Sequence, residues 1–222
     1  MNFSYEIPLH RLLTLPSLAN LYIWLKTIIL WLIMDNEKLS ILRLLIENAE
    51  KEFSIRQISK ARKINYKSAH GNIMSLEKEG AVKIRRHGNV SLCSFSRKFG
   101  ESVFLVEHKR MEEFLKNKNF QVLHSRLKKI NSQFILLVFG SQAKGKAKKH
   151  SDIDLLCIAE NAKKIEDELD LLPMKIHLTS ISYKDFMSML KSKEQTVVSE
   201  AVKKNIILFG MEDYYRLIEN AQ

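Results

Sequence analysis

Two short clusters of polar residues in the second half of the chain have the types and spacing to hold a phosphate group beside a divalent cation. Gly140 and Ser141 follow the apolar run 134–139, and ten residues separate Ser141 from Asp152, which is followed by Asp154. A glycine allows a tight turn and close approach of the backbone, and the serine adds a hydroxyl. Two carboxylates supply the hard oxygen ligands that Mg²⁺ prefers, with phosphates and water completing its coordination.

The elements around these clusters must bring them together. The run 134–139 reads FILLVF and predicts a strand buried on both faces. If a helix begins at the turn that follows, its free N–H groups and positive dipole end would face a phosphate. Residues 151–158 predict a second strand, with Asp152 and Asp154 on one face. The segment between the two strands adds cations that would attract a triphosphate, namely Lys144, Lys146, Lys148 and Lys149.

The sequence GSQAKGKAKKHSDIDLL resembles the Gly-Ser, ten-residue spacer, Asp-x-Asp signature of the DNA polymerase beta superfamily, in particular its minimal nucleotidyltransferases. The resemblance covers roughly residues 131–210. It implies a small mixed sheet with flanking helices, catalytic and metal-binding roles for Asp152 and Asp154, and nucleotide binding at Gly140 and Ser141. The implied cofactors are Mg²⁺ or Mn²⁺ and a nucleoside triphosphate, with ATP expected.

One position departs from this pattern. The family usually carries a third carboxylate on a following strand, and the matching segment 175–179 has His177 at that place. A histidine can ligate a metal or act as a base near neutral pH, and it can also lie on the surface of a strand without any such role. The acidic run 166–170 could supply a carboxylate instead, although the solvated face of a helix explains it better. The sequence leaves open whether the site turns over.

Residues 36–98 show a different pattern. They predict a helix with an apolar face over 39–46, helices over 55–62 and 66–79, and a hairpin over 81–95. This order resembles a winged helix-turn-helix, which would place its third helix in the major groove of DNA. The expected DNA contacts lie on that helix and on the hairpin, at Tyr66, Lys67, Ser68, His70, Arg85, Arg86 and His87.

The charge of this segment supports the same interpretation. Residues 36–98 hold fourteen Lys or Arg against six Glu, which accounts for +8 of the chain's net charge of +11. Such an excess favours a polyanionic partner, and DNA is the expected one. A dimerisation or protein-docking role is the alternative, because a basic face can simply be solvated.

The N-terminal region 1–35 contains an apolar stretch, 18–34, which is marginally long enough to span a bilayer but has Lys26 in its middle. A membrane anchor, a helix packed on the next segment, and a translation start misplaced at Met1 are the three interpretations. We favour a true start at Met34, where the next segment begins cleanly. Contact with a membrane is expected only if 18–34 is a genuine anchor.

The 222 residues are enough for two compact domains in an α+β protein. The expected division is an apolar N-terminal segment, a winged helix-turn-helix, a helical connector and a mixed-sheet nucleotidyltransferase-like domain, over 1–35, 36–98, 99–130 and 131–222. The only two cysteines, Cys93 and Cys157, fall within predicted strands and fit no zinc spacing. They are expected to be buried thiols in a reducing cytoplasm.

Two functions remain in view. The first is metal-dependent transfer of a nucleoside monophosphate from a triphosphate to a protein or nucleic-acid acceptor, with an attached DNA-binding module. Because the minimal enzymes include antitoxins that add AMP to a toxin's tyrosine, the resemblance makes a protein hydroxyl a candidate acceptor. The second is a transcriptional regulator whose nucleotide-binding domain is catalytically weak or inactive, which His177 favours. We prefer the enzyme because both halves of the signature are intact; a homodimer would suit paired DNA half-sites.

Overall fold

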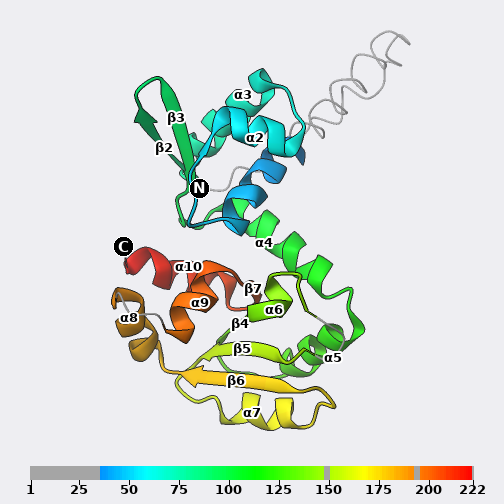
Figure 1. The fold of residues 1–222 in the computed structure, drawn as a ribbon. Coiled ribbons are helices and arrows are strands. Elements are labelled where there is room, and N and C mark those ends of the chain that lie inside the picture. Colours follow the sequence, from blue (N-terminus) through cyan, green and yellow to red (C-terminus); the bar gives the residue numbers. More distant parts are fainter. Residues whose placement is uncertain (1–35, 148–150, 193–195, 222) are drawn as a thin grey trace, which may run out of the picture. The chain divides into compact units, whose positions relative to one another are not determined.

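A computed structural model describes residues 36–147, 151–192 and 196–221 of the chain (Figure 1). Residues 37–222 form one compact unit. The interpretations of residues 1–35, as an anchor or as a misplaced start, lie outside the described residues, as do the predicted phosphate-attracting side chains of Lys148 and Lys149. No helix in the described ranges combines the length and the apolar character needed to cross a bilayer.

The first half of the unit is a set of helices packed on a small antiparallel sheet. Ser54 caps the helix that follows it through reciprocal hydrogen bonds with Gln57, and Asn65 caps the next helix by accepting from the backbone N–H of Ser68. The strands lie in the order β1–β3–β2. After a helix over residues 36–47, the elements are β1 (Phe53–Ser54), α2 (Ile55–Arg62), α3 (Tyr66–Lys78), β2 (Val82–His87) and β3 (Val90–Phe95).

The second half is built on a four-stranded mixed sheet in the order β6–β5–β4–β7, in which β5 and β6 are parallel and the other pairs antiparallel. Its elements, with the two helices that precede them, are α4 (Glu101–Phe114), α5 (Lys118–Leu127), β4 (Ile135–Phe139), α6 (Gly140–Ala143), β5 (Ile153–Ile158), α7 (Lys163–Asp170), β6 (Ile176–Ile181), α8 (Tyr183–Lys191), α9 (Val197–Lys203), β7 (Ile206–Phe209) and α10 (Met211–Asn220).

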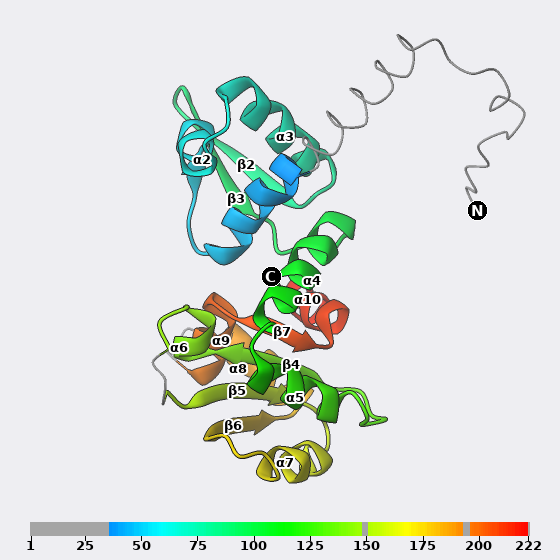
Figure 2. The same ribbon diagram turned by 90° about the vertical axis from the view of Figure 1, so that its right-hand side faces the viewer.

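Helices cover both faces of this sheet (Figure 2). Leu136 and Val138 of β4 pack with α5 and α7, whereas Ile135, Leu137 and Phe139 pack with α8, α9 and α10. Every residue of β4 is therefore buried, as the unbroken apolar run predicts. Because side chains alternate along a strand, Asp154 of β5 points to the α8–α9 face, on the side opposite α7.

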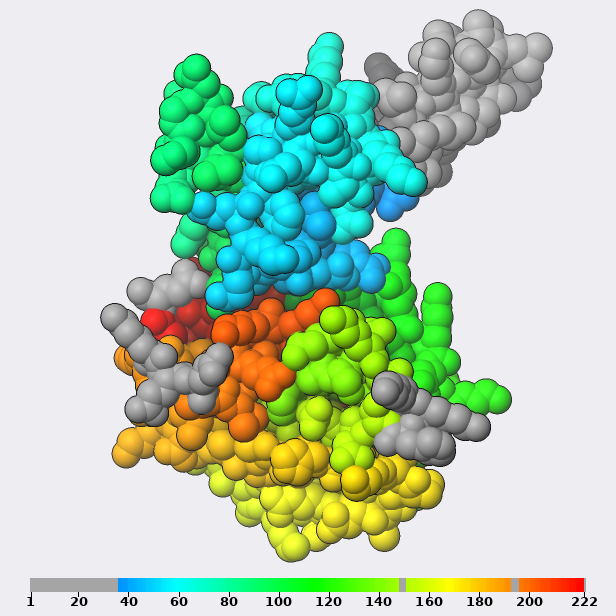
Figure 3. Space-filling model, viewed as in Figure 1, coloured from blue at the N-terminus to red at the C-terminus, as the bar shows by residue number. Residues whose placement is uncertain are grey.

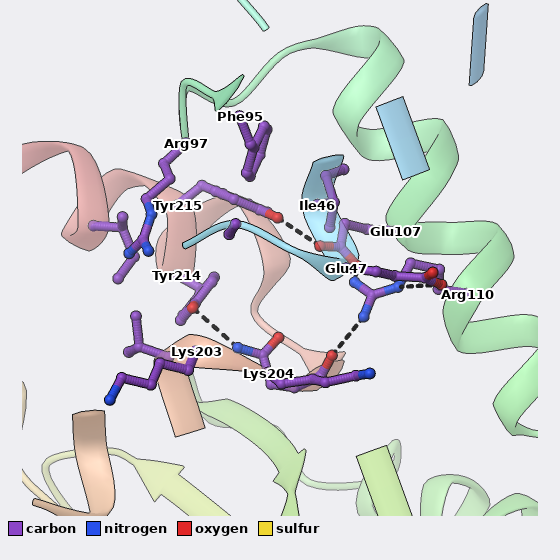
Figure 4. A pocket seen from close by; sticks show the side chains of 14 residues that line it. Ile46, Glu47, Phe95, Arg97, Glu107, Arg110, Lys203, Lys204, Tyr214 and Tyr215 are labelled. Carbon is purple, nitrogen blue, oxygen red and sulfur yellow. Dashed lines mark hydrogen bonds and ion pairs between the residues drawn. The ribbon is translucent and has the colours of Figure 1, made fainter. Parts of the chain in front are cut away.

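A buried polar network ties α4 to β7 and α10 (Figure 4). Glu107 and Arg110 of α4, only 2% and 4% exposed, form an ion pair. The hydroxyl of Tyr215 donates to Glu107 Oε1 at 2.5 Å, and Arg110 Nη2 donates to the carbonyl of Asn205 at 2.7 Å. The Asn205 amide in turn donates to the Tyr214 hydroxyl at 3.1 Å. Buried charges persist only when they are paired and hydrogen-bonded, so this network fixes α4 against the sheet.

Tyr214 and Tyr215 are shielded from solvent where α10 meets α4 and β7. Burial raises the pKa of Tyr214 to about 12, and burial together with the adjacent Glu107 raises the pKa of Tyr215 well above its ordinary value. The ring centroid of Tyr215 lies 5.9 Å from that of Phe95 and 5.8 Å from that of Phe99. The hydrophobic core consequently continues from the helices around β3 into the mixed sheet.

Candidate nucleotide and metal site

The carboxylate of Asp154 lies directly against the turn between β4 and α6. Gly140 is buried and has φ +67°, a conformation that side-chain-bearing residues rarely adopt. A β-carbon at position 140 would lie 2.2 Å from Asp154 Oδ2 and 3.1 Å from its Cγ. The lack of a side chain at Gly140 is thus what allows this carboxylate to rest on the turn. The structure brings together the two halves of the sequence signature at this point.

The helix that follows the turn is shorter than a phosphate-binding helix of the usual kind. A helix does begin at Gly140, but α6 ends at Ala143 after a single turn. The aligned dipole of one turn is small, so a phosphate here would rely on individual N–H groups and on the half-buried Ser141 hydroxyl. Gly145, at φ +65° directly after the C-cap residue Lys144, is the stop signal from which this short length could have been read in the sequence.

The two aspartates have different surroundings. Asp152 lies one residue before β5 rather than within it, and its carboxylate accepts from Lys175 Nζ at 2.8 Å. Asp154 lies in β5, opposite Phe139 of β4 and opposite His177 of β6. The prediction that both aspartates belong to the strand is therefore wrong by one residue. Sequence reasoning did not single out Lys175. Its ammonium group is already paired with one of the two carboxylates, that of Asp152.

His177 lies beside Asp154, as the matching of segments predicts. The parallel pairing of β5 with β6 makes the two residues direct neighbours, and His177 Nδ1 is 3.7 Å from Asp154 Oδ1. The imidazole is 74% exposed, which leaves it accessible from solvent. No carboxylate takes this place in the described part of the two strands. His177 therefore lies at the position where the family usually has a third carboxylate, as the sequence indicated.

The acidic run of α7 is on the other side of the sheet. Ile165 and Leu169 of α7 pack into the core that α5 shares, and Glu166 accepts a hydrogen bond from the Ser180 hydroxyl of β6 at 3.0 Å. Glu168 pairs with Arg126 of α5 at 3.4 Å. These carboxylates belong to the face opposite Asp154, so they do not supply the missing acid.

The donor set fits one divalent cation held together with a phosphate. Among the described residues, no three or more His, Cys, Asp or Glu side chains gather as a ready-made metal cage. Mg²⁺ does not require such a cage, since it commonly uses one or two carboxylates and takes its remaining ligands from phosphates and water. Asp152 and Asp154 match that requirement. A second cation would lack a third carboxylate.

The surface around the turn offers both charge and space. Lys144 Nζ pairs with Glu200 Oε1 of α9 at 2.8 Å, so α6 and α9 adjoin, as they do in yellow-green and orange in Figure 3. Lys146 is exposed beyond the turn. A groove of about 630 Å³ adjoins Asp152 through Lys175, and side chains from α5 and α6 line it as well, including Asn119 and Gln142.

A second candidate surface lies on α3 and the β2–β3 hairpin. Tyr66, Lys67 and His70 are exposed near the start of α3, as predicted. Ser68 is not, because its hydroxyl bonds to the Glu37 carboxylate and accepts from the Asn72 amide at 3.3 Å. The Ser68 side chain is therefore turned toward Glu37 and Asn72 and is not presented to a ligand. Glu37 precedes Ser68 by 31 positions, which is why the local pattern does not reveal the contact.

The hairpin presents the three predicted side chains. Arg85, Arg86 and His87 are exposed on β2, but Arg85 already pairs with Glu52 at 2.6 Å. A groove of about 670 Å³ runs between α2, the start of α3 and the hairpin, and its lining includes Arg56, Lys60, Tyr66 and Val90. The basic residues of α2 were missed by sequence reasoning, although their charge pattern could have indicated them.

The comparison with known proteins concerns the second half of the chain. Residues 121–214 match the family model described as "Polymerase beta, Nucleotidyltransferase". No curated protein matches the chain. The matched residues include most of α5, the whole mixed sheet and both aspartates, and they support a nucleotidyltransferase-type function. Residues 121–214 are therefore similar to nucleotidyltransferase domains of the polymerase beta type.

Proposed function

We propose that the chain is a metal-dependent nucleotidyltransferase, which moves a nucleoside monophosphate from a triphosphate to a hydroxyl on a protein or nucleic acid. The observation that carries this proposal is the seating of the Asp154 carboxylate on Gly140, since it joins the phosphate-binding turn to the carboxylate pair. Asp152 and Asp154 would hold Mg²⁺ or Mn²⁺, which when bound neutralises triphosphate charge and assists departure of pyrophosphate.

The chain's own groups have separate tasks in this proposal. Gly140 leaves room for the Asp154 carboxylate to rest on the turn, and the Ser141 hydroxyl donates to a phosphate oxygen. The acceptor oxygen bonds to the α-phosphorus, and the bond from that phosphorus to the bridging oxygen breaks. Pyrophosphate leaves with the electron pair, and the acceptor proton passes to solvent.

We infer that residues 36–98 act as a winged helix-turn-helix that binds DNA. The order of helices and strands and the +8 charge support this, as does the basic groove that contains Arg56 and Lys60. Tyr66, Lys67 and His70 would face the bases, and the hairpin would lie along phosphates. A homodimer would let two such modules occupy paired half-sites.

The test of the enzyme is transfer of labelled α-phosphate by the full-length chain. The protein would be incubated with each α-labelled nucleoside triphosphate, beginning with ATP, with Mg²⁺ or Mn²⁺ and with protein and RNA acceptors. The matched variants are Asp152→Asn and Asp154→Asn, which remove charge while keeping side-chain size. Label that appears with the wild type and falls at least about a hundredfold in both variants is the expected result. Label that is unchanged in the variants would place the chemistry elsewhere.

A second function is favoured by His177 in the place of an acid. The chain would then be a DNA-binding regulator whose nucleotidyltransferase-type domain binds nucleotide without efficient turnover. Nucleotide binding that changes the affinity for DNA, together with no label transfer under either metal, is the outcome that selects this alternative. Asp152→Asn would then weaken the response to nucleotide but leave DNA affinity without nucleotide unchanged.

A further inference from the structure

Strand β6 is the outer strand of the mixed sheet and has β5 as its only strand neighbour among the described residues (Figure 1). The carbonyl of Lys175 accepts from the N–H of Ile153 at 2.9 Å. The carbonyl of Ile181 accepts from the N–H of Ala159 at 3.1 Å, so the odd-numbered residues from 175 to 181 point their peptide groups toward β5. Because successive residues of a strand direct these groups to opposite sides, the N–H and C=O groups that face outward are those of Ile176, Leu178 and Ser180.

The sequence of β6 does not protect this edge. Natural sheet edges are kept from pairing with other chains by proline, lysine, bulges, short length or a covering element. Residues 176–181 read IHLTSI, contain no proline or lysine, and none of the six is buried. At the opposite edge of the sheet, β7 is four residues long and pairs with β4 through an irregular register. Of the two edges, β6 is therefore the one that is suited to accept a further strand.

A groove of about 480 Å³ lies between β6 and α7. Glu166 and Asp170 of α7 supply two carboxylates to its lining, and among its described lining residues there is no lysine or arginine, although the whole chain carries a net charge of +11. The large side chain of Leu171, at the end of α7, is 65% exposed. The apolar lining of the groove consists of Leu169, Leu172, Met174, Ile176 and Leu178.

The charge of the groove selects among the possible occupants of this edge. A nucleic-acid strand would bring its phosphates against Glu166 and Asp170, and a second copy of β6 would bring the same two carboxylates against them. Like charges that face each other across an interface cost free energy, whereas lysine and arginine side chains are attracted there. When a peptide adds a strand to a sheet edge, main-chain hydrogen bonds supply affinity and pockets for alternate side chains supply specificity.

We propose that the outer edge of β6 binds an extended, basic segment of a partner protein as an additional strand. The backbone of the segment pairs with the outward N–H and C=O groups of β6. Alternate side chains enter the groove, where lysine or arginine lies against Glu166 and Asp170. The intervening side chains lie on the face of His177, which is next to the Asp154 carboxylate. Strand addition needs neither nucleotide nor metal, so this binding does not depend on the proposed transfer reaction.

The experiment measures binding of a fluorescein-labelled peptide to the full-length chain by fluorescence anisotropy, without nucleotide or metal. In the peptide, threonine alternates with lysine or valine, so an extended strand presents lysine and valine on one face and threonine on the other. The control peptide has glutamate in place of lysine. The lysine peptide binds at least about tenfold more tightly than the glutamate peptide, even though the net positive charge of the chain favours the latter. Equal affinities, or the reverse order, would overturn the proposal.

Two matched pairs of variants test the edge and the groove separately. Ser180→Pro removes an outward N–H and leaves the hydrogen bonds to β5 in place, whereas Ser180→Ala removes only the hydroxyl that donates to Glu166. Binding of the lysine peptide weakens by at least about fivefold in Ser180→Pro and by less than about twofold in Ser180→Ala. Asp170→Lys abolishes the preference for the lysine peptide. Asp167→Lys keeps that preference, because Asp167 lies on the same helix but outside the groove lining.

Light scattering on the same variants identifies the competing occupant. A wild-type dimer that Ser180→Pro dissociates and Ser180→Ala does not would show that a second copy pairs with β6, which would overturn the proposal. Peptide binding that is unchanged in Ser180→Pro, with its fold verified by circular dichroism, would overturn it as well. If Ser180→Pro does not fold, the comparison of Asp170→Lys with Asp167→Lys decides. Label transfer is measured separately, so failure of the proposed enzyme and failure of this docking surface are distinguishable.

Discussion

The carboxylate of Asp154 lies in the space that a β-carbon on Gly140 would occupy, with only 2.2 Å between the two positions. The contact joins residues that are fourteen positions apart and belong to different elements. It means that the turn and the carboxylate are a single steric unit. A substitution that moves either one therefore displaces the other, even when no nucleotide or metal is bound.

Replacing this glycine tests that unit, and the chain offers a matched control. Gly140→Ala meets both the carboxylate and a backbone at φ +67°, whereas Gly145→Ala meets a similar φ of +65° with nothing within 4 Å. We expect Gly145→Ala to lower the free energy of unfolding by about 1 kcal/mol through backbone strain alone. Gly140→Ala should lower it by about 2–4 kcal/mol.

The readouts for the glycine pair are urea unfolding and label transfer from α-labelled ATP. Transfer by Gly140→Ala should fall at least about a hundredfold, since a displacement of about 1 Å at a catalytic group can have this effect. Gly145→Ala should retain transfer within a few fold. Equal losses of transfer in the two variants would show that the contact with Asp154 has no special importance.

The buried hydroxyl of Tyr215 should contribute measurably to stability. Tyr215→Phe leaves Glu107, which is 2% exposed, with one fewer hydrogen bond, so the free energy of unfolding should fall by about 1–3 kcal/mol. Tyr183→Phe is the control, because the buried Tyr183 hydroxyl has no hydrogen-bond partner among the described residues. Its removal breaks no hydrogen bond and relieves the cost of burying an unpaired hydroxyl, so stability should stay the same or rise. Urea titration of the three proteins would reveal the difference, and a neutral Tyr215→Phe would contradict it.

The two thiols should be unreactive in the folded protein. Cys93 and Cys157 are buried, and burial raises the pKa of the first to about 11 and of the second to about 12. Since the thiolate is the reactive form, a thiol-specific reagent at pH 8 should modify both cysteines only after denaturant is added. Modification of the native protein within minutes would show that these strands open readily.

The same pKa values predict how stability depends on alkaline pH. The unfolded thiols ionise near pH 9, whereas the folded ones stay protonated to about 11 and 12, so the folded state binds more protons in between. The stabilising contribution is therefore complete below about pH 9 and is lost as pH rises toward 11 and 12. Urea midpoints measured from pH 7.5 to 10.5 should decline above pH 9. Substituting both cysteines with alanine should flatten that decline, even though it lowers stability at pH 7.5.

The two arginines of the hairpin should differ in their effect on DNA binding. Arg85 is paired with Glu52 at 2.6 Å, whereas neighbouring Arg86 forms no ion pair with the described residues. Arg86→Ala should weaken DNA affinity and reduce the salt dependence of binding by about one phosphate contact. Arg85→Ala should do less, since its charge is already partly compensated. Fluorescence anisotropy at several salt concentrations would measure both, and a larger loss for Arg85→Ala would exclude this assignment.

Local sequence was sufficient for features that depend on neighbouring residues. The position of His177 beside Asp154 was expected from the family pattern and not from local sequence. The FILLVF run and the caps at Ser54 and Asn65 follow from periodicity and from the side-chain chemistry of nearby residues. The inward turn of Ser68 and the ion pair of Asp152 with Lys175 do not, because each depends on a residue more than twenty positions away.

The start of α4 within the expected helical connector 99–130 is also hidden from the local pattern. The structure begins α4 at Glu101, yet Phe104 and Leu105 in its first turns are 45% and 43% exposed. An apolar pair on the solvent side hides the one-sided pattern that indicates a helix. Tertiary contacts of Val103 and Val106, both buried, decide where the helix begins.

The buried ion pair of Glu107 and Arg110 has a practical consequence for dissecting the chain. A fragment that begins at residue 121, where the family match starts, would keep Tyr215 and Asn205 but lose both of their charged partners on α4. It would also uncover the ring of Tyr215, which Phe95 and Phe99 contact. A fragment cut at the start of the family match should therefore be less stable than one that includes α4.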